Sequence, residues 1–200
     1  KAAYLAQFLA ALESFHADGI PIASYISYPG SNEVGNSLRL MLCDNASQGC
    51  TRCQPDNGAR RLCQFIGTVL DRQLFEGLLG PGERTDVFQS QSAILRHYGP
   101  HTSQFLYLNV GGEIARIEAP QWVMQDSAMR DRVHSIVFDQ CRRSGQYPPY
   151  PPVLIEAHEQ AVISTADRRA VTDLIEQVLA ARGQDHLRSA KDRSKRSRGV

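Results

Sequence analysis

The chain has 200 residues, of which 42% are hydrophobic and 22% are charged, a composition typical of a globular domain rather than a disordered or fibrous chain. Its 22 basic and 21 acidic residues leave a net charge of +1, so bulk charge favours no class of partner. No apolar run approaches the roughly 20 residues that cross a bilayer, and five cysteines without a secretory signal lead us to expect a reducing, cytoplasmic compartment.

The first quarter of the chain predicts a helix, a strand and a second helix. Apolar residues recur at helical spacing from Leu5 to Leu12, and the chain opens on Lys1 without an initiator Met, so we expect it to be cut from a longer protein. Residues 20–27 (IPIASYIS) predict a buried strand. Ser31 can cap the second helix. We expect its inward stripe to comprise Val34, Leu38, Met41 and Leu42.

The middle of the chain contains the strongest hairpin signal. A short helix is expected over residues 71–79, before a turn at residues 80–82. Residues 103–110 and 113–118 then predict two strands, joined by Gly111 and Gly112. These two glycines allow the tight turn that an antiparallel pair requires.

The last third of the chain predicts three helices. The first begins near Ser127, and we expect its inward face to comprise Met129, Val133, Ile136, Val137 and Cys141. The second covers residues 154–163, after a proline-rich turn. The third begins at a capping-box pattern, Ser164 and Asp167, and ends at Arg182-Gly183. The order of elements predicts an α/β fold with a mixed sheet flanked by helices.

The C-terminal end differs from the rest in charge. Residues 188–200 carry six basic residues and one acidic residue, a net charge of +5, so the remaining residues carry −4. With almost no apolar side chain to bury, residues 184–200 are expected to form a disordered basic tail after a domain spanning residues 1–183. Such a tail can contact phosphates without reading sequence, although a solvated terminus without a role fits equally well.

His158 is the most informative single residue. On a helix, it falls near the middle of an apolar face, while Glu156 points to the far side. The other residues of that face are Leu154, Ile155, Ala157, Ala161 and Val162. An imidazole buried there needs a hydrogen-bond partner or a metal, because an unpaired polar group costs about 1–3 kcal/mol. The pattern favours a satisfied core histidine, with a metal ligand as the alternative.

Four cysteines form a second candidate site within residues 43–63. The spacing is Cys43-x6-Cys50-x2-Cys53-x9-Cys63, in which the Cys50-x2-Cys53 pair is typical of metal sites. The outer spacings match no standard zinc finger. The loop therefore predicts either free thiols or a structural zinc ion or iron–sulfur cluster. Elsewhere, five arginines are candidates for contact with a DNA backbone: Arg39, Arg84, Arg116, Arg142 and Arg143.

Several short stretches, in order along the chain, together resemble the NurA nuclease family. The most specific is Tyr150-Pro-Pro-Val-Leu-Ile-Glu-Ala-His158-Glu159, followed by Ala161-Val-Ile163. Others are Gly19-Ile-Pro-Ile-Ala-Ser-Tyr-Ile-Ser27 with Glu33-Val34, Pro81-Gly-Glu-Arg84, Phe105-Leu-Tyr-Leu-Asn-Val110, Ala115-Arg-Ile-Glu118 with Pro120 and Trp122, and Asp139-Gln-Cys-Arg142. Their shared order, from about residue 19 to residue 182, makes the resemblance specific.

The resemblance implies a manganese-dependent (or magnesium-dependent) DNA nuclease of double-strand break repair with an RNase H-like core. It also implies a homodimer that works beside a hexameric HerA-type translocase. The family's site combines acidic metal ligands with a tyrosine and a histidine, which match Tyr150 and His158. Tyr147 competes for the tyrosine position, because the chain reads Tyr-Pro-Pro-Tyr-Pro-Pro.

One expected part of this site is missing from the sequence. The family's acidic ligands occur upstream in Asp-Gly-Ser or Asp-Gly-Thr contexts, and the chain contains neither. We therefore expect the C-terminal part of such a nuclease, inactive alone. Two alternatives remain open: a non-catalytic module for docking to the translocase or for dimerisation, and a nucleic-acid-binding domain organised by a metal in the cysteine loop.

Overall fold

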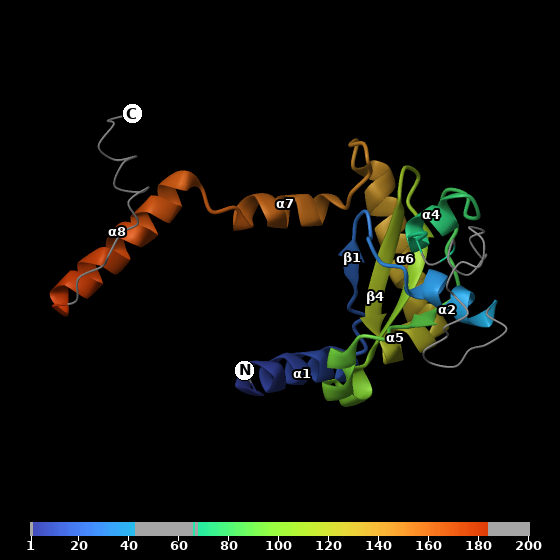
Figure 1. Ribbon diagram of the computed structural model, residues 1–200, viewed down its shortest axis with the longest axis horizontal. Helices are drawn as coiled ribbons and strands as arrows, with labels where there is room; N and C mark the ends of the chain where they lie inside the picture. The colour runs from blue at the N-terminus through green and yellow to red at the C-terminus, as the bar shows by residue number, and fades with distance from the viewer. Residues whose placement is uncertain (1, 43–65, 67, 184–200) are drawn as a thin grey trace, which may run out of the picture. The chain divides into compact units, whose positions relative to one another are not determined.

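The structure, a computed structural model, describes residues 2–42, 66 and 68–183 (Figure 1). It divides the chain into two compact units, Lys1–Leu154 and Ile155–Val200. The helices and strands of the first unit are α1 (Ala2–Ala17), β1 (Ser24–Ile26), α2 (Glu33–Met41), α4 (Asp71–Glu76), β2 (Phe88–Gln89), η3 (Ala93–His97), η4 (Gly99–His101), β3 (Ser103–Asn109), β4 (Ile114–Pro120), α5 (Gln121–Gln125) and α6 (Ser127–Arg143). Helix α7 (Pro152–Ala161) begins in the first unit, and α8 (Thr165–Ala181) lies in the second.

The predicted hairpin forms the centre of the sheet. Strands β3 and β4 pair along their whole length, from Ser103 opposite Pro120 to Asn109 opposite Ile114. Gly111 adopts a φ of 97° in the connection, a conformation that glycine tolerates and other residues rarely adopt. The hairpin is therefore confirmed at the position that the two glycines indicated.

The sheet has the strand order β1-β4-β3-β2, and all of its pairings among the described residues are antiparallel. The α/β class is confirmed, but the expected mixed sheet is wrong. Strands β1 and β2 each align antiparallel to their hairpin neighbour, at opposite edges of the sheet. Strand β2 is only two residues long. The alternation of apolar and polar residues that identifies a strand cannot be recognised over so short a segment.

Both faces of the hairpin are buried. Because successive side chains of a strand point to opposite faces, Leu106 and Leu108 pack into one core and Phe105 and Tyr107 into another. The first core also contains Val123 and Met124 of α5 and Val133 and Cys141 of α6, and the second contains Val34 of α2 and Phe75 of α4. Helices thus cover the central hairpin of the sheet on both sides.

Four burial predictions are wrong. The stretch expected as a buried strand forms only β1, whose residues are exposed or half-buried, because β1 is an edge strand that pairs with β4 on one side. Met41, Leu42 and Ile136, expected on inward faces, are 81%, 52% and 51% exposed. Helical periodicity identified the apolar stripe but not how much of it the sheet covers. Cys141 is buried as predicted.

The second unit contains the rest of α7 and helix α8. The predicted capping box is confirmed: the Ser164 side chain accepts a hydrogen bond from the Asp167 backbone, and Asp167 accepts one from the Ser164 backbone. In the part of the chain that the structure describes, none of the helices is long and apolar enough to cross a membrane. Residues 184–200 lie outside the described residues, so the basic tail stays a prediction.

Candidate functional site

A buried arginine between two carboxylates marks the most unusual polar site of the first unit. Arg116 of β4 is 4% exposed. Its Nε donates to Glu118 Oε1 at 2.7 Å, and its Nη1 lies 2.8 Å from Glu33 Oε1 at the start of α2. Its guanidinium carbon also lies over the Phe105 ring, 3.6 Å from the ring centre. We call Glu33, Arg116 and Glu118 the acid–arginine cluster.

The groups around Arg116 keep its guanidinium ionised. Burial lowers the pKa of Arg116, but the charge of Glu118 and the bonds to Tyr107 and Glu33 outweigh that effect, so its pKa is raised. The guanidinium therefore stays charged at any physiological pH. Two carboxylates against one guanidinium leave the cluster with an excess negative charge.

A chain of hydrogen bonds connects the cluster to a second buried carboxylate. Arg116 Nη1 donates to Ser31 Oγ at 3.1 Å, and Tyr107 Oη donates to Asp71 Oδ2 at 2.7 Å. Ser31 Oγ and Tyr107 Oη are 2.8 Å apart. Since the Tyr107 proton points to Asp71, the Ser31 hydroxyl donates to Tyr107. Burial raises the pKa of Tyr107 to about 12, which keeps this phenol protonated and able to donate.

Asp71 ties helix α2 to this chain. Its carboxylate is fully buried and accepts bonds from the backbone N–H groups of Val34 and Gly35, at 3.2 and 2.8 Å, besides the Tyr107 hydroxyl. It thereby caps the N-terminus of α2. A Cβ atom on Gly35 would lie only 3.2 Å from the Val69 carbonyl oxygen, so glycine permits the close approach. Ser31, predicted as the cap of α2, bonds to Tyr107 and Arg116 instead.

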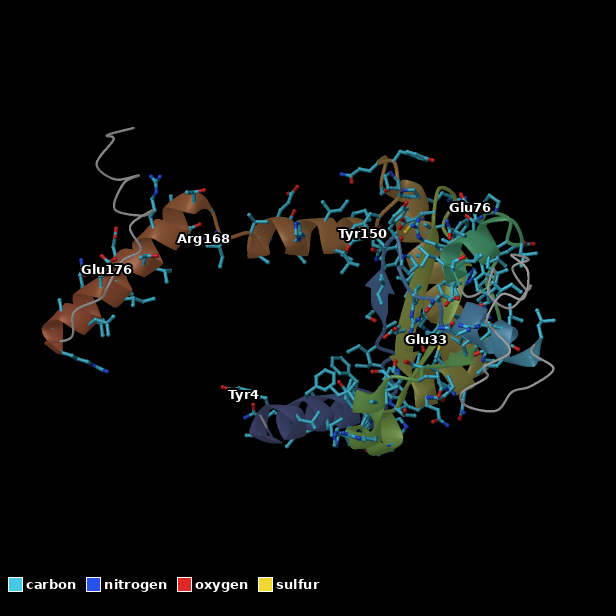
Figure 2. The ribbon with its side chains drawn as sticks, viewed as in Figure 1. Tyr4, Glu33, Glu76, Tyr150, Arg168 and Glu176 are labelled. Atoms are coloured by element: carbon cyan, nitrogen blue, oxygen red, sulfur yellow. The ribbon has the colours of Figure 1, made fainter. Side chains whose placement is uncertain are left out.

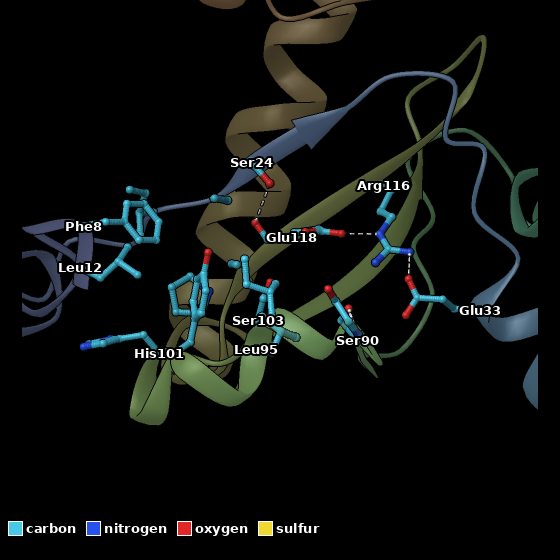
Figure 3. Close-up of a pocket in the computed structure, with 17 residues that line it drawn as sticks. Phe8, Leu12, Ser24, Glu33, Ser90, Leu95, His101, Ser103, Arg116 and Glu118 are labelled. Atoms are coloured by element: carbon cyan, nitrogen blue, oxygen red, sulfur yellow. Dashed lines mark hydrogen bonds and ion pairs between the residues drawn. The ribbon is translucent and has the colours of Figure 1, made fainter. Parts of the chain in front are cut away.

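The acid–arginine cluster lines one end of a cavity of about 530 Å³ (Figure 3). The serines Ser24, Ser90 and Ser103 line the cavity beside the cluster. The far end is mostly apolar and is formed by α1 and the η3 region, with Phe8, Leu12, Ile94, Leu95 and Tyr98, and it also contains the buried imidazole of His101. The volume lies within the range of small-ligand sites, and the two carboxylates and the guanidinium gather at the opposite end.

Tyr150 lines a second cavity, of about 480 Å³, between β1 and α6. Its ring packs edge-on against Tyr25, with the ring centres 5.2 Å apart. The Tyr25 hydroxyl in turn donates to Glu113 Oε1 at 2.8 Å. Ala23 and Ser24 line both cavities, so the start of β1 separates them. Tyr147, the competing tyrosine, is 85% exposed.

His158 does not occupy the buried position that its helical pattern favours. It lies on α7 as predicted, but its side chain is exposed, and no residue of α7 is buried. The satisfied core histidine is therefore wrong for this structure, because the apolar face is covered only at its start: Leu154 and Ile155 are half-buried, whereas Val162 is 57% exposed. Figure 2 labels Tyr150 at the start of α7, in the first unit, whereas His158 belongs to the second unit.

A catalytic metal centre does not assemble from the described residues alone. Among residues 2–42, 66 and 68–183, the fold brings together no group of three or more His, Cys, Asp or Glu side chains that could hold an ion. The carboxylates of Glu33 and Glu118 are already bonded to Arg116, so these residues by themselves do not fit a catalytic metal. The predicted site of Cys43, Cys50, Cys53 and Cys63 lies outside the described residues.

Most of the arginines that are candidates for DNA contact form ion pairs within the chain. Arg84 pairs with Asp131, and both Arg142 and Arg143 pair with Asp139. Arg116 is buried in the acid–arginine cluster. Its pairing with Glu118 has a sequence signal that was missed: residues two apart on a strand share a face. The bond to Glu33 joins residues far apart in sequence and has no such signal.

The comparisons with known proteins identify one family. A model of the NurA domain matches residues 1–163, more than three quarters of the chain and all of the elements that form the two cavities. No curated protein and no solved structure is significantly similar to the chain.

Proposed function

The chain belongs to the NurA domain family, and from this membership we propose that it forms part of a metal-dependent nuclease that processes DNA double-strand breaks. The match over residues 1–163 is the observation that carries the proposal, because the family implies a nuclease-type function in DNA repair. The physical support is a cavity with two carboxylates at one end, built on the central strands of the sheet.

The acid–arginine cluster is, in this proposal, one wall of the site and not the whole of it. Phosphodiester cleavage requires several oxygen ligands to hold the ions that stabilise the attacking and leaving oxygens. We infer that acidic residues encoded upstream of Lys1 complete a manganese or magnesium site. The 200-residue chain alone is then inactive.

His158 and Tyr150 have separate roles in this proposal. The exposed imidazole of His158 binds or positions the ion, since imidazole suits manganese better than magnesium. Tyr150, fixed against Tyr25, uses its hydroxyl to orient a phosphate oxygen or the attacking water. Tyr147 is 85% exposed and is the weaker candidate.

Three broader proposals follow from family membership. The antiparallel strands β1 to β4 form part of an RNase H-like core. The complete protein is a cytoplasmic homodimer that acts on DNA. It works beside a HerA-type translocase.

Degradation of labelled single-stranded DNA in the presence of Mn²⁺ tests the proposal. We expect the chain extended by its upstream sequence to degrade the strand, the 200-residue chain to leave it intact, and a chelator to stop the reaction. Robust cleavage by the 200-residue chain would show that its own residues complete the site. If the extended protein is folded and does not cleave, the nuclease proposal is wrong.

A further inference from the structure

Tyr28 is an exposed aromatic residue held in a strained backbone conformation. Its φ is 49°, the only positive φ of a non-glycine residue among those described, and its side chain is 68% exposed. Left-handed backbone is unfavourable for a bulky residue and persists where the surrounding structure enforces it, often at functional sites. Pro29, which follows, is buried and fixes the chain at this point.

The guanidinium of Arg72 covers one face of the Tyr28 ring. Its Cζ lies 3.5 Å from the ring centre, closer than in a loose surface contact. Among the described residues, the buried Nε of Arg72 has no hydrogen-bond partner. The position of Arg72 is therefore explained by stacking on the ring rather than by hydrogen bonding of its Nε.

The pair is anchored next to the acid–arginine cluster. Arg72 directly follows Asp71, whose backbone N–H donates to the Ser31 carbonyl at 3.0 Å. Ser31 lies three residues after Tyr28, and its hydroxyl accepts from Arg116. The same short contact between two loops thus holds the Tyr28–Arg72 pair and the cluster, so a ligand at Tyr28 lies close to the proposed site.

An unpaired nucleobase matches this arrangement. Every base has a flat π-face that can stack on an aromatic side chain such as Tyr28. An adjacent guanidinium attracts the phosphates that flank the stacked base. Within a duplex both faces of a base are stacked, so the ligand is a single strand or a frayed end. A protein partner would also favour Tyr and Arg, but the fixed stack beside a proposed nuclease site favours DNA.

We propose that Tyr28 and Arg72 form a base-stacking platform for single-stranded DNA. This inference rests on the proposed function and adds to it the residues that hold the strand. Stacking has little sequence preference, so the platform should bind oligonucleotides of different bases with similar affinity.

Fluorescence anisotropy of a labelled oligo-dT, with the 200-residue chain and a chelator present, tests the platform through binding alone. Tyr28→Gly removes the ring and suits the positive φ, so its melting temperature should stay near that of the wild type. We expect it to weaken DNA binding about 5- to 100-fold. Tyr28→Phe keeps the ring and should bind like the wild type.

The controls separate stacking from general effects. Tyr4→Ala, at a tyrosine that is 78% exposed, should leave the affinity unchanged. The slope of affinity against salt should be the same for Tyr28→Phe and the wild type, because the ring that holds the Arg72 guanidinium is kept. Equal affinity of Tyr28→Gly and the wild type, or equal weakening by Tyr28→Phe, would overturn the platform alone. Absence of DNA binding by the wild type would overturn the platform, whereas the proposed nuclease is tested separately by DNA cleavage with the upstream-extended protein.

Discussion

Replacing Asp71 with alanine is expected to destabilise the first unit by about 3–5 kcal/mol. The carboxylate is fully buried and accepts three hydrogen bonds, from Val34, Gly35 and Tyr107. Alanine would leave the N–H groups of Val34 and Gly35 buried without a partner, would remove the acceptor of the Tyr107 proton and would uncap α2. Urea unfolding measures this loss of stability: the urea concentration at the midpoint should fall, while the slope of the unfolding free energy against urea concentration stays the same.

A second aspartate provides the matched control. Asp126 caps α6 by accepting one bond, from the Met129 backbone N–H at 2.9 Å, and it is exposed. Asp126→Ala should therefore destabilise the protein by only about 1 kcal/mol. A loss for Asp71→Ala no greater than that for Asp126→Ala would show that Asp71 does not hold α2 to the sheet.

Replacing Arg116 with methionine is expected to destabilise the protein by about 2–4 kcal/mol. Methionine fills similar space over Phe105 but leaves Glu33 and Glu118 without their shared cation. The two carboxylates are 29% and 27% exposed, so water moderates the penalty below that of a fully buried pair. Urea unfolding at neutral pH measures it.

A lysine variant identifies the cause. Arg116→Lys keeps the charge but loses the planar fork that bonds both glutamates, so its loss of stability should be smaller than that of Arg116→Met. Equal losses for the two variants would mean that the charge of Arg116 does not hold the two carboxylates together.

The sequence predicted best the features whose determinants lie within a few residues. The glycines of the hairpin and the Ser164–Asp167 capping box each specify a local geometry without help from the rest of the fold. Cys141 was placed correctly because its stripe on α6 packs against the sheet. Local chemistry is sufficient in these cases.

The features that depend on distant partners could not be predicted. Asp71 was expected only as the start of a short helix, whereas it caps α2 across 36 residues of sequence. Helical periodicity identifies the apolar face of a helix but not whether another element packs against it. The interior position favoured for His158 was wrong for this reason. The contact of Tyr150 with Tyr25 joins residues far apart in the chain and leaves no trace in the spacing. The pairing of Tyr150 and His158 in one site stays a prediction.

The most direct test of the proposed nuclease is the rate at which the upstream-extended protein degrades labelled single-stranded DNA with Mn²⁺, compared with its His158→Ala variant. Because the His158 side chain is exposed, the substitution should leave the unfolding midpoint unchanged. We expect the rate to fall by about 100-fold or more, the effect of losing a metal-positioning or acid–base group. Equal rates for the two folded proteins would contradict the assignment of His158 to the site, and absence of activity in both would contradict the nuclease itself.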